Sequence, residues 1–451
     1  MTRDEVFKRF DEEAQLINER SADGIEKYRK GDAVVTVTGA DGKPVKGAHV
    51  KITQKTHDFK YGANIFMLDE FENQEKNDIY RDVFKKTFNL ATVPFYWKDL
   101  EPEFGKPRYE IGSPKVYRRP SPDLCLEYCE KNGVTPKAHC LNYDHYTGPW
   151  LRGKSVDEVK YGLEQHFAEV AARYKDRIHC WEVINELLCR WGANNPNDIT
   201  AFYNAPDVLE WSFDTARKYF PDNELIINEA SMVWSDQWYM DNRSTYFMQI
   251  ERALTKGAVI DGIGMQFHQF CAESEYGDRY NEERTFSAKQ LYKVMDLYDH
   301  FKKPTQVTEV TIPAYHDDAH NEELQARAIE NYYKIWFSHK NTEAIVYWNV
   351  VDGYAAWAPQ GDMKAGENVY YGGLMSYDMR EKPALKTIQR MFGETYRTNL
   401  ELTTDDNGEV SFRGFYGDYE IEAANSDAKC SYTTHLAKGD KNKSEIIFKA
   451  D

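Results

Sequence analysis

Two glutamates, each placed at or near the end of a short apolar run, are candidates for catalytic side chains. Glu186 follows the run IHCWEVIN at 178–185, and Glu309 lies in VTEVTIP at 307–313. A pair of carboxylates is what glycoside hydrolysis needs. One protonates the leaving oxygen, and the other, about 5–5.5 Å away in retaining enzymes, attacks the anomeric carbon. The question is whether the fold can place these two side chains face to face.

The tripeptide Ile-Asn-Glu occurs three times, at 17–19, 184–186 and 227–229, so the motif alone identifies no catalyst. The first copy lies in a charged stretch with helical periodicity, where a solvated helix face is the simplest interpretation. The third ends an apolar run much like the one before Glu186. Position in the fold must therefore separate Glu186 from Glu229.

Apolar strand candidates alternate with helical patterns through most of the chain, and near-continuous apolar runs are typical of strands buried on both faces. The expected strands are 59–66, 88–95, 135–141, 178–185, 225–229, 260–267, 305–310 and 344–350. Successive strand ends fall about 40 residues apart, and eight such units predict a (β/α)₈ TIM barrel. A doubly wound open sheet is the rival, but no Gly-rich phosphate loop follows the first strand.

In such a barrel the active site lies at the carboxyl ends of the strands. The polar residues expected there are His139 to His145, Asn185 with Glu186, Asn228 with Glu229, Gln266, His268, Glu309 and Trp348. The fourth and seventh strands face each other across an eight-strand ring, which pairs Glu186 with Glu309 and makes Glu229 a poorer partner. Asn228 is still expected to line the site, and His268 to hold or tune Glu309.

The same ring lacks the dense His and Asp set of a metal hydrolase, and no Gly-x-Ser-x-Gly nucleophile elbow occurs. We therefore expect no metal and no cofactor. The seven cysteines are scattered and odd in number, with no Cys-x-x-Cys pair, and are expected to be free thiols.

Alternating strand-like runs at both ends of the chain predict a second, smaller domain. The hairpin sequences DGKPVKGA at 41–48 and TDDNGEVSFRGFYGDYEIEA at 404–423 resemble those of prealbumin-like or Cna-B-like β-sandwiches. Because a few strands cannot form a stable sheet alone, we expect the two ends to pack together. The expected domains are a helix at 1–31, a split sandwich of 32–57 with 398–451, and the barrel at 58–397. Two separate β-appendages are the alternative, and a structural role for the sandwich is favoured over sugar binding.

The composition bounds the partners. A formal net charge of −17 argues against nucleic acid or an anionic membrane as a partner. Aromatic residues make up 14% of the chain, and their flat faces suit stacking on sugar rings. No apolar run reaches the ~18–20 residues of a membrane helix. The charged N-terminus does not resemble a signal peptide, which leaves two alternatives, a cytoplasmic location or a leader that has been removed. Secretion with a leader removed is slightly favoured. A monomer is expected.

Five motifs, in the right order, resemble those of glycoside hydrolase family 10, whose best-known members are endo-β-1,4-xylanases. They are WEVINE (181–186), DGIGMQFH (261–268), TEVTI (308–312), YWNVVDGYAAW (347–357) and GGLMSYDMREKPAL (372–385). The resemblance covers about 59–395 and implies a retaining double displacement, with Glu309 as nucleophile and Glu186 as acid and base. It also implies substrate contacts from Asn185, His139, Gln266, His268, Trp348 and Trp357.

Two segments depart from that family's pattern. In TVPFYWKDLEP at 92–102, Trp97 aligns, but Val93 and Tyr96 stand where the family has an Asn and a Lys that hold a sugar. In HCLNYDH at 139–145, Tyr143 replaces a Trp, and Asp144 replaces a His that is found one place later as His145; Trp150 aligns with a later Trp. The resemblance implies that the residues at these positions contact substrate, namely Trp97, Tyr143, Asp144, His145 and Trp150. We expect Tyr96 and Phe95 to stack on sugar or to narrow the cleft, and the specificity to be altered.

The sequence thus predicts a retaining glycosidase that cleaves β-1,4-xylosidic bonds in decorated xylan or in xylo-oligosaccharides. A retaining enzyme for another β-linked glycan or a plant glycoside is the alternative within the class. A non-catalytic carbohydrate-binding protein is the alternative outside it. In each case the expected partner is a polysaccharide or oligosaccharide.

Overall fold

The computed structural model describes residues 3–189, 199–276, 286–426, 428–439 and 442–448. The chain divides into two compact units. One comprises Met1–Ile17, Tyr61–Trp336 and Asn341–Thr387, and the other comprises Asn18–Lys60, Phe337–Lys340 and Ile388–Asp451. The domain boundaries expected from the sequence stay a prediction. No helix among the described residues is long and apolar enough to cross a membrane.

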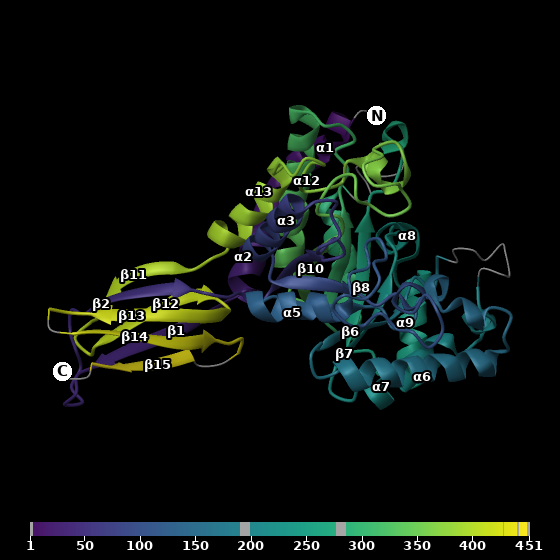
Figure 1. Ribbon diagram of the computed structural model, residues 1–451. Coiled ribbons are helices and arrows are strands. Elements are labelled where there is room, and N and C mark those ends of the chain that lie inside the picture. The colour runs from purple at the N-terminus through teal and green to yellow at the C-terminus, as the bar shows by residue number, and fades with distance from the viewer. Residues whose placement is uncertain (1–2, 190–198, 277–285, 427, 440–441, 449–451) are drawn as a thin grey trace. The chain divides into compact units, whose positions relative to one another are not determined.

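Eight strands close the first unit into a barrel (Figure 1). They are β3 (Lys60–Asn64), β4 (Leu90–Pro94), β5 (Thr135–His139), β6 (Cys180–Asn185), β7 (Glu224–Glu229), β8 (Gly262–His268), β9 (Thr305–Thr311) and β10 (Thr342–Tyr347). Each strand from β3 to β9 pairs in parallel with the next one along the chain, and β10 completes the ring beside β3. Every residue of β6 and β9 is buried, as expected of strands covered on both faces. The predicted TIM barrel is confirmed, and the open sheet is excluded.

Helices follow the strands of the barrel. They are α3 (Gln74–Thr87), α4 (Trp97–Leu100), α5 (Pro122–Asn132), α6 (Val156–Tyr174), α7 (Val208–Tyr219), α8 (Met232–Met240), α9 (Thr245–Thr255), α11 (Ala288–Tyr298), α12 (Ala319–Ser338) and α13 (Pro383–Arg390). Their ends are encoded locally. Ser155 and Glu158 form a capping box at the start of α6, while Pro122 begins α5 and Gly133, at φ 65°, ends it.

The N-terminal segment forms two helices, α1 (Arg3–Glu12) and α2 (Ala14–Tyr28), where a single helix was expected. The break falls at Glu13, whose buried carboxylate accepts a hydrogen bond of 2.6 Å from the backbone N–H of Ala288 and others from Ser287 and Lys289, at the start of α11. A carboxylate placed at a helix N-terminus satisfies otherwise unpaired N–H groups and opposes the positive end of the helix dipole.

The second unit is built from strands of both chain ends. One sheet has the order β12-β1-β15 and the other β11-β2-β13-β14. Their bounds are β1 (Lys30–Thr38), β2 (His49–Gln54), β11 (Asn399–Thr403), β12 (Glu409–Phe415), β13 (Gly417–Ala424), β14 (Lys429–Leu436) and β15 (Asn442–Ile447). Since β1 pairs with β12 and β2 with β13, N- and C-terminal segments share both sheets, which excludes two separate appendages.

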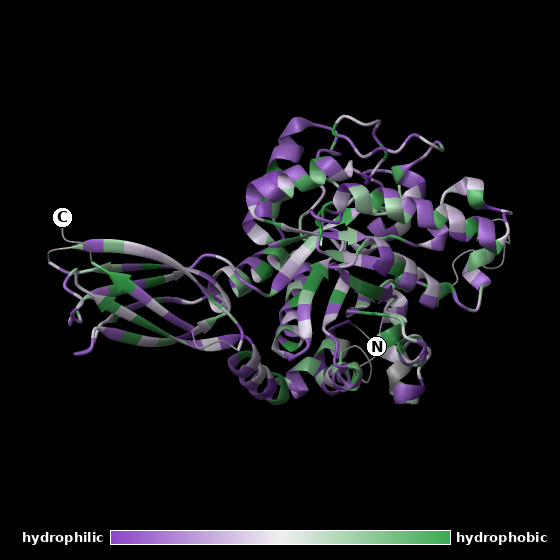
Figure 2. Ribbon diagram, turned by 90° about the horizontal axis from the view of Figure 1, so that it is seen from below, coloured by the Kyte–Doolittle hydropathy of each residue, from purple (hydrophilic) through white to green (hydrophobic). Residues whose placement is uncertain are grey.

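In β1, β12 and β13 buried residues alternate with more exposed ones. Figure 2 shows hydrophobic and hydrophilic residues interleaved along the strands of this unit. The buried residues form one apolar cluster between the sheets, with Val37, Val50 and Ile421 fully buried. The Asp41-Gly42 and Asn407-Gly408 turns place their glycines at φ 75° and 74°, a conformation that other residues adopt with strain. The small sheets expected from the chain termini are therefore present.

Candidate active site

Glu186 and Glu309 lie close together at the carboxyl ends of β6 and β9. Gln266, on β8, connects them: its Nε2 lies 2.9 Å from Glu186 Oε1 and 3.0 Å from Glu309 Oε1, so these two oxygens are at most about 6 Å apart, the sum of the two distances. Inverting glycosidases separate their carboxyl groups by roughly 6.5–9.5 Å and retaining ones by roughly 5–5.5 Å. The spacing therefore fits the closer, retaining arrangement, in which one carboxylate attacks directly.

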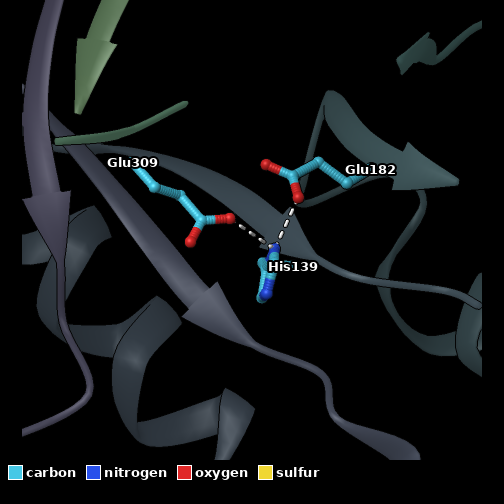
Figure 3. Close-up of side chains that lie close together, drawn as sticks. All are labelled: His139, Glu182 and Glu309. Carbon is cyan, nitrogen blue, oxygen red and sulfur yellow. Dashed lines mark hydrogen bonds and ion pairs between the residues drawn. The ribbon is translucent and has the colours of Figure 1, made fainter. Parts of the chain in front are cut away.

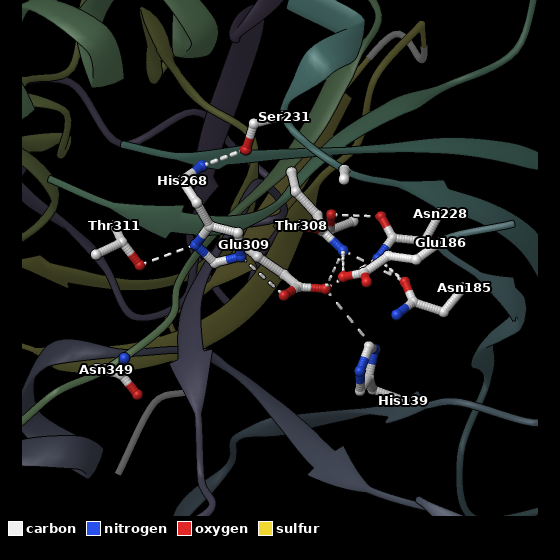
Figure 4. Close-up of polar contacts among 12 residues, drawn as sticks. His139, Asn185, Glu186, Asn228, Ser231, His268, Thr308, Glu309, Thr311 and Asn349 are labelled. Atoms are coloured by element: carbon white, nitrogen blue, oxygen red, sulfur yellow. Dashed lines mark hydrogen bonds and ion pairs between the residues drawn. The ribbon is translucent and has the colours of Figure 1, made fainter. Parts of the chain in front are cut away.

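Glu309 is buried and receives hydrogen bonds from opposite sides (Figure 4). Asn228 Nδ2 donates to Oε1 at 3.0 Å, and His268 Nε2 lies 3.1 Å from Oε2. His268 Nδ1 lies 2.9 Å from the Thr311 hydroxyl, which can donate to it and leave Nε2 protonated toward Glu309. Burial lowers the pKa of His268 to about 4, so the ring is neutral near pH 7 and acts as a directed donor.

Burial also raises the pKa of Glu309, while the charge of His139 opposes this effect and those of Glu182 and Glu186 add to it. The donors from Asn228 and Gln266 both reach Oε1, and His268 reaches Oε2, so neither oxygen is left as a natural place for a proton. Hydrogen bonds to the charged form favour ionisation. These donors therefore support the ionised state that a nucleophile needs.

Behind Glu309 lies a buried charge cluster that sequence reasoning missed (Figure 3). Glu182 Oε1 lies 2.6 Å from Lys137 Nζ, an ion pair without the geometry of a directed hydrogen bond, and Glu182 Oε2 lies 2.5 Å from His139 Nδ1. All three side chains are 1% exposed. His139 Nδ1 is also 4.0 Å from Glu309 Oε1. Burial opposes ionisation of Glu182, but Lys137 and His139 outweigh it and hold its pKa below the usual range.

The ligand atoms of His139, Glu182 and Glu309 lie within 4.8 Å of one another, close enough to be considered for a metal. Their chemistry argues against one. His139 already bonds Glu182 directly, and the Lys137 ammonium places a positive charge beside the same carboxylate, where it would repel a cation. We interpret the cluster as a network of buried charges that holds His139 and Glu309 in position.

Glu186 is half-buried and directed by its neighbours. The Tyr143 hydroxyl donates to its Oε2 at 2.5 Å, and its backbone takes φ 53°, which is uncommon for a residue with a side chain. Glu229, buried on β7, accepts hydrogen bonds of 2.9 Å from the N–H groups of Leu188 and Ala230. Glu229 thus holds the turn that carries Glu186. This structural role fits the expectation that Glu229 is a poorer partner for Glu186 than Glu309 is.

Glu186 and Glu309 both line a cavity of about 760 Å³. Its lining includes the predicted residues His139, Tyr143, His145, Asn185, Glu186, Gln266, His268, Glu309, Trp348 and Trp357. Trp348 is buried at its base, edge-on to Phe66 and to His139, whereas Trp357 is 68% exposed and lies beside His145. Asn228 lies one layer deeper and touches Glu309, Glu182 and Asn185 at once.

Besides Asn228, three residues predicted to contact substrate do not line this cavity. Trp97 is buried with its ring stacked on His166 at 4.2 Å and its N–H bonded to Glu101. Trp150 packs edge-on against Trp97. Asp144 faces away and accepts hydrogen bonds from Arg152 and from the backbone of Thr200. The alignment of these residues with family positions did not reveal that local partners already use their polar groups and faces.

Expectations for the first departing segment, TVPFYWKDLEP at 92–102, also need correction. Phe95 is fully buried against Trp181 and Tyr174, away from the cavity. Tyr96 does line the cavity, but its hydroxyl lies 2.9 Å from His139 Nε2 and the Arg119 guanidinium lies 3.9 Å from its ring centre. One Tyr96 face is thus occupied by a cation, and the pocket wall there is formed by an arginine–tyrosine pair.

Comparison with known proteins settles the family. The model of the family described as "Glycosyl hydrolase family 10" matches residues 55–391. The chain belongs to this family. Among curated relatives, a beta-1,4-xylanase of Dictyoglomus thermophilum is 26% identical over 293 residues, covering 61% of this chain and 74% of the relative. Anti-sigma-I factor RsgI6 of Acetivibrio thermocellus is 21% identical over 423 residues, covering 92% of this chain and 48% of the relative.

The chain therefore spans about half the length of that anti-sigma factor, and 34% of endo-1,4-beta-xylanase 2 of Arabidopsis thaliana, with which it shares 21% identity over 427 residues. Solved family 10 structures share the barrel fold. Xylanase 10B from Thermotoga petrophila RKU-1 in complex with xylobiose gives a TM-score of 0.55 at 21% identity, covering 75% of this chain and 95% of that one. Native xylanase 10B from Thermotoga maritima gives 0.54 at 21% identity, covering 75% and 96%.

Proposed function

We propose that this family 10 chain is a retaining glycosidase that cleaves β-1,4-xylosidic bonds, with Glu309 as nucleophile and Glu186 as acid and base. The observation that carries the proposal is the Gln266 amide, which touches both carboxylates and limits their separation to about 6 Å. The xylanase names among the relatives support xylose as the sugar.

In the first step, a Glu309 oxygen forms a bond to the anomeric carbon while the bond from that carbon to the leaving oxygen breaks. Glu186 gives its proton to the leaving oxygen, so the departing sugar leaves neutral. The donors Asn228, Gln266 and His268 hold the Glu309 carboxylate in place. Because they are fixed before the reaction, aligning the nucleophile costs no further reorganisation.

In the second step, Glu186 accepts a proton from water, and the water oxygen bonds to the anomeric carbon as the ester to Glu309 breaks. Tyr143 and Gln266 donate to Glu186 and hold it on the side where that water arrives. The sugar is released with its original anomeric configuration, and both glutamates return to their starting protonation states.

We propose decorated xylan or xylo-oligosaccharides as substrates. The cavity retains Asn185, Gln266, His268 and Trp348 around the two glutamates. The wall near Tyr96 and Tyr143 is rebuilt with aromatic and arginine side chains, which supports a change in which sugar, or which decoration, is accepted. Cleavage of another β-linked glycan or a plant glycoside is the alternative outcome of the same experiment.

The test is turnover on a panel of linear, arabinosylated and glucuronosylated xylans and β-glucans, with the anomer of the first product followed by proton NMR. We expect xylan cleavage with β-anomer released first. Glu309→Gln should abolish turnover while oligosaccharide binding persists. Glu127→Gln, which alters an exposed ion pair on α5, is the matched control and should retain activity.

Initial release of the α-anomer would overturn the double displacement, and turnover by Glu309→Gln would overturn the assignment of the nucleophile. Binding without turnover on the whole panel would favour a carbohydrate-binding protein instead. Activity restricted to β-glucans or plant glycosides would replace xylose as the substrate but leave the assigned mechanism in place.

A further inference from the structure

Two consecutive arginines line the cavity that holds the catalytic glutamates. Arg118 is 4% and Arg119 is 9% exposed, and both lie on the wall formed with Phe66 and Tyr96, at the ends of β3 and β4. The Arg118 guanidinium lies 5.7 Å and that of Arg119 5.3 Å from the Phe66 ring centre. The steps described above use neither residue. Burying two guanidinium groups side by side is costly unless each finds a partner.

The partners present satisfy Arg119 better than Arg118. Arg119 Nε donates to Asp99 at 2.8 Å. Arg118 donates from Nη1 to the carbonyl of Tyr354, while its Nε is buried with no hydrogen-bond partner. Among the described residues, no carboxylate oxygen lies within 4.0 Å of an Arg118 guanidinium nitrogen. Arg118 is therefore a buried cation with unused donor capacity in the wall of a substrate cavity.

The loop that carries the pair is held rigidly by a third arginine. Arg108 donates from Nη2 to the Arg119 carbonyl at 3.0 Å and from Nη1 to the Asp99 carbonyl at 2.8 Å. Arg119 in turn donates from Nη1 to the Arg118 carbonyl at 3.0 Å. These bonds hold the loop backbone and the Arg119 side chain, and the bond to the Tyr354 carbonyl holds the Arg118 guanidinium, so binding loses little side-chain freedom.

One carboxylate shares the cavity and must be considered. Glu367 lines it, accepts a hydrogen bond of 3.1 Å from Asn349 and raises the pKa of Arg118, although burial lowers that pKa overall. Glu367 thus balances part of the charge of Arg118 from a distance without pairing with it. A ligand carboxylate at the Phe66 and Tyr96 wall would supply the missing direct contact.

We propose that this arginine pair binds the carboxylate of a uronic acid carried by the glycan, so that the preferred substrate is an acidic xylo-oligosaccharide. The proposal rests on the proposed function, because it names a decoration of the substrate cleaved at the same site. Arginine suits this task because its planar fork matches a carboxylate and stays charged at any working pH.

The test compares two substrates that differ only at the carboxyl group of the uronic acid. One is the pool of uronic-acid-branched xylo-oligosaccharides released from glucuronoxylan, and the other is the same pool after reduction of each carboxyl group to a primary alcohol. We expect kcat/KM of the unaltered protein to be about tenfold or more higher on the acidic pool, a typical effect of a charge-assisted hydrogen bond. Equal values on the two pools would overturn the proposal, and this comparison needs no variant to fold.

Two variants then locate the effect. Arg118→Gln should lose the preference for the acidic pool, whereas Arg81→Gln should keep it, since Arg81 pairs with Asp69 and does not line the cavity. A preference that survives in Arg118→Gln would overturn the assignment. Binding and turnover of both pools by the unaltered protein separate the two proposals: acidic preference in binding without any turnover would reject the proposed hydrolysis and retain the uronate site.

Discussion

Replacing Glu182 with Gln should destabilise the barrel sharply, because it leaves a buried ammonium without its counter-charge. Glu182 lies 2.6 Å from Lys137, and both side chains are 1% exposed. The substitution keeps the shape of the side chain and removes only its charge, so the loss can be assigned to electrostatics.

The expected magnitude follows from the burial of the pair. Removing one partner of a buried ion pair typically costs about 3–5 kcal/mol, since the remaining charge stays desolvated. We place Glu182→Gln in that range, because the neutral amide fits the same space but cannot balance the charge of Lys137. Removing both charges is often close to neutral, so Lys137→Met combined with Glu182→Gln should recover most of the loss.

The assay is urea unfolding of the three proteins followed by tryptophan fluorescence at several pH values. Because the folded-state pKa of Glu182 is lowered, its stabilising effect is fully present above the usual glutamate pKa and is lost as pH falls through the folded value. The difference between the unaltered protein and Glu182→Gln should therefore be largest near pH 7 and shrink in acid. A difference below about 1 kcal/mol at pH 7, or a double variant less stable than Glu182→Gln, would refute the charge argument.

Three further predictions concern single side chains. Tyr143→Phe removes the 2.5 Å hydrogen bond to Glu186 and should lower kcat/KM about 10- to 100-fold on xylo-oligosaccharides, as expected for a bond to a charged group; an unchanged value would separate Tyr143 from catalysis. Trp357→Ala should raise KM roughly 3- to 10-fold through lost stacking, and leave the unfolding midpoint unchanged because the ring is 68% exposed; a shifted midpoint would show a structural role. Burial lowers the pKa of His166 to about 3, so the folded state keeps this histidine neutral. As pH falls from 7 to 5, the unfolded chain takes up a proton at its pKa of 6.5, and the free energy of unfolding drops by about 2 kcal/mol. His166→Phe, which can still stack on Trp97, should remove that part of the acid sensitivity in urea titrations; identical pH dependence in both proteins would contradict it.

The barrel could be predicted because each strand carries its own signal. Runs such as IHCWEVIN are apolar on both faces, and the regular spacing between them leaves room for one helix each. The closeness of Glu186 and Glu309 follows from the same regularity, since the carboxyl ends of strands four and seven must meet at one mouth. The resemblance of WEVINE and TEVTI to family 10 motifs then suggested the roles that we propose for these two glutamates.

The residues that the sequence analysis missed differ in how much local signal they leave. Lys137 and Glu182 did leave a signal, a charged residue inside each of two neighbouring apolar strands, which suggests a buried pair. Arg118 and Arg119 gave none, because the long loop between α4 and α5, which has no strand or helix pattern of its own, brings them back to the ends of β3 and β4. Trp97 misled for the opposite reason: its place in the chain matches the family, but His166 and Glu101 already occupy its ring and its N–H.

Both sheets of the second unit combine N-terminal with C-terminal strands, and this sets an order of folding during synthesis. Strand β1 pairs with β12 and β15, and β2 pairs with β11 and β13, so each needs a partner made after the entire barrel segment. At about 5–20 residues per second, these N-terminal strands wait roughly 20–70 s for their partners. The ring closes with β10 beside β3, which brings the first and last parts of the barrel segment together and shortens the effective loop that the late pairing must close. Assembly of the terminal sheets is therefore conditional on the barrel, and a lesion in the barrel core is expected to leave β1 and β2 as unpaired, aggregation-prone edges.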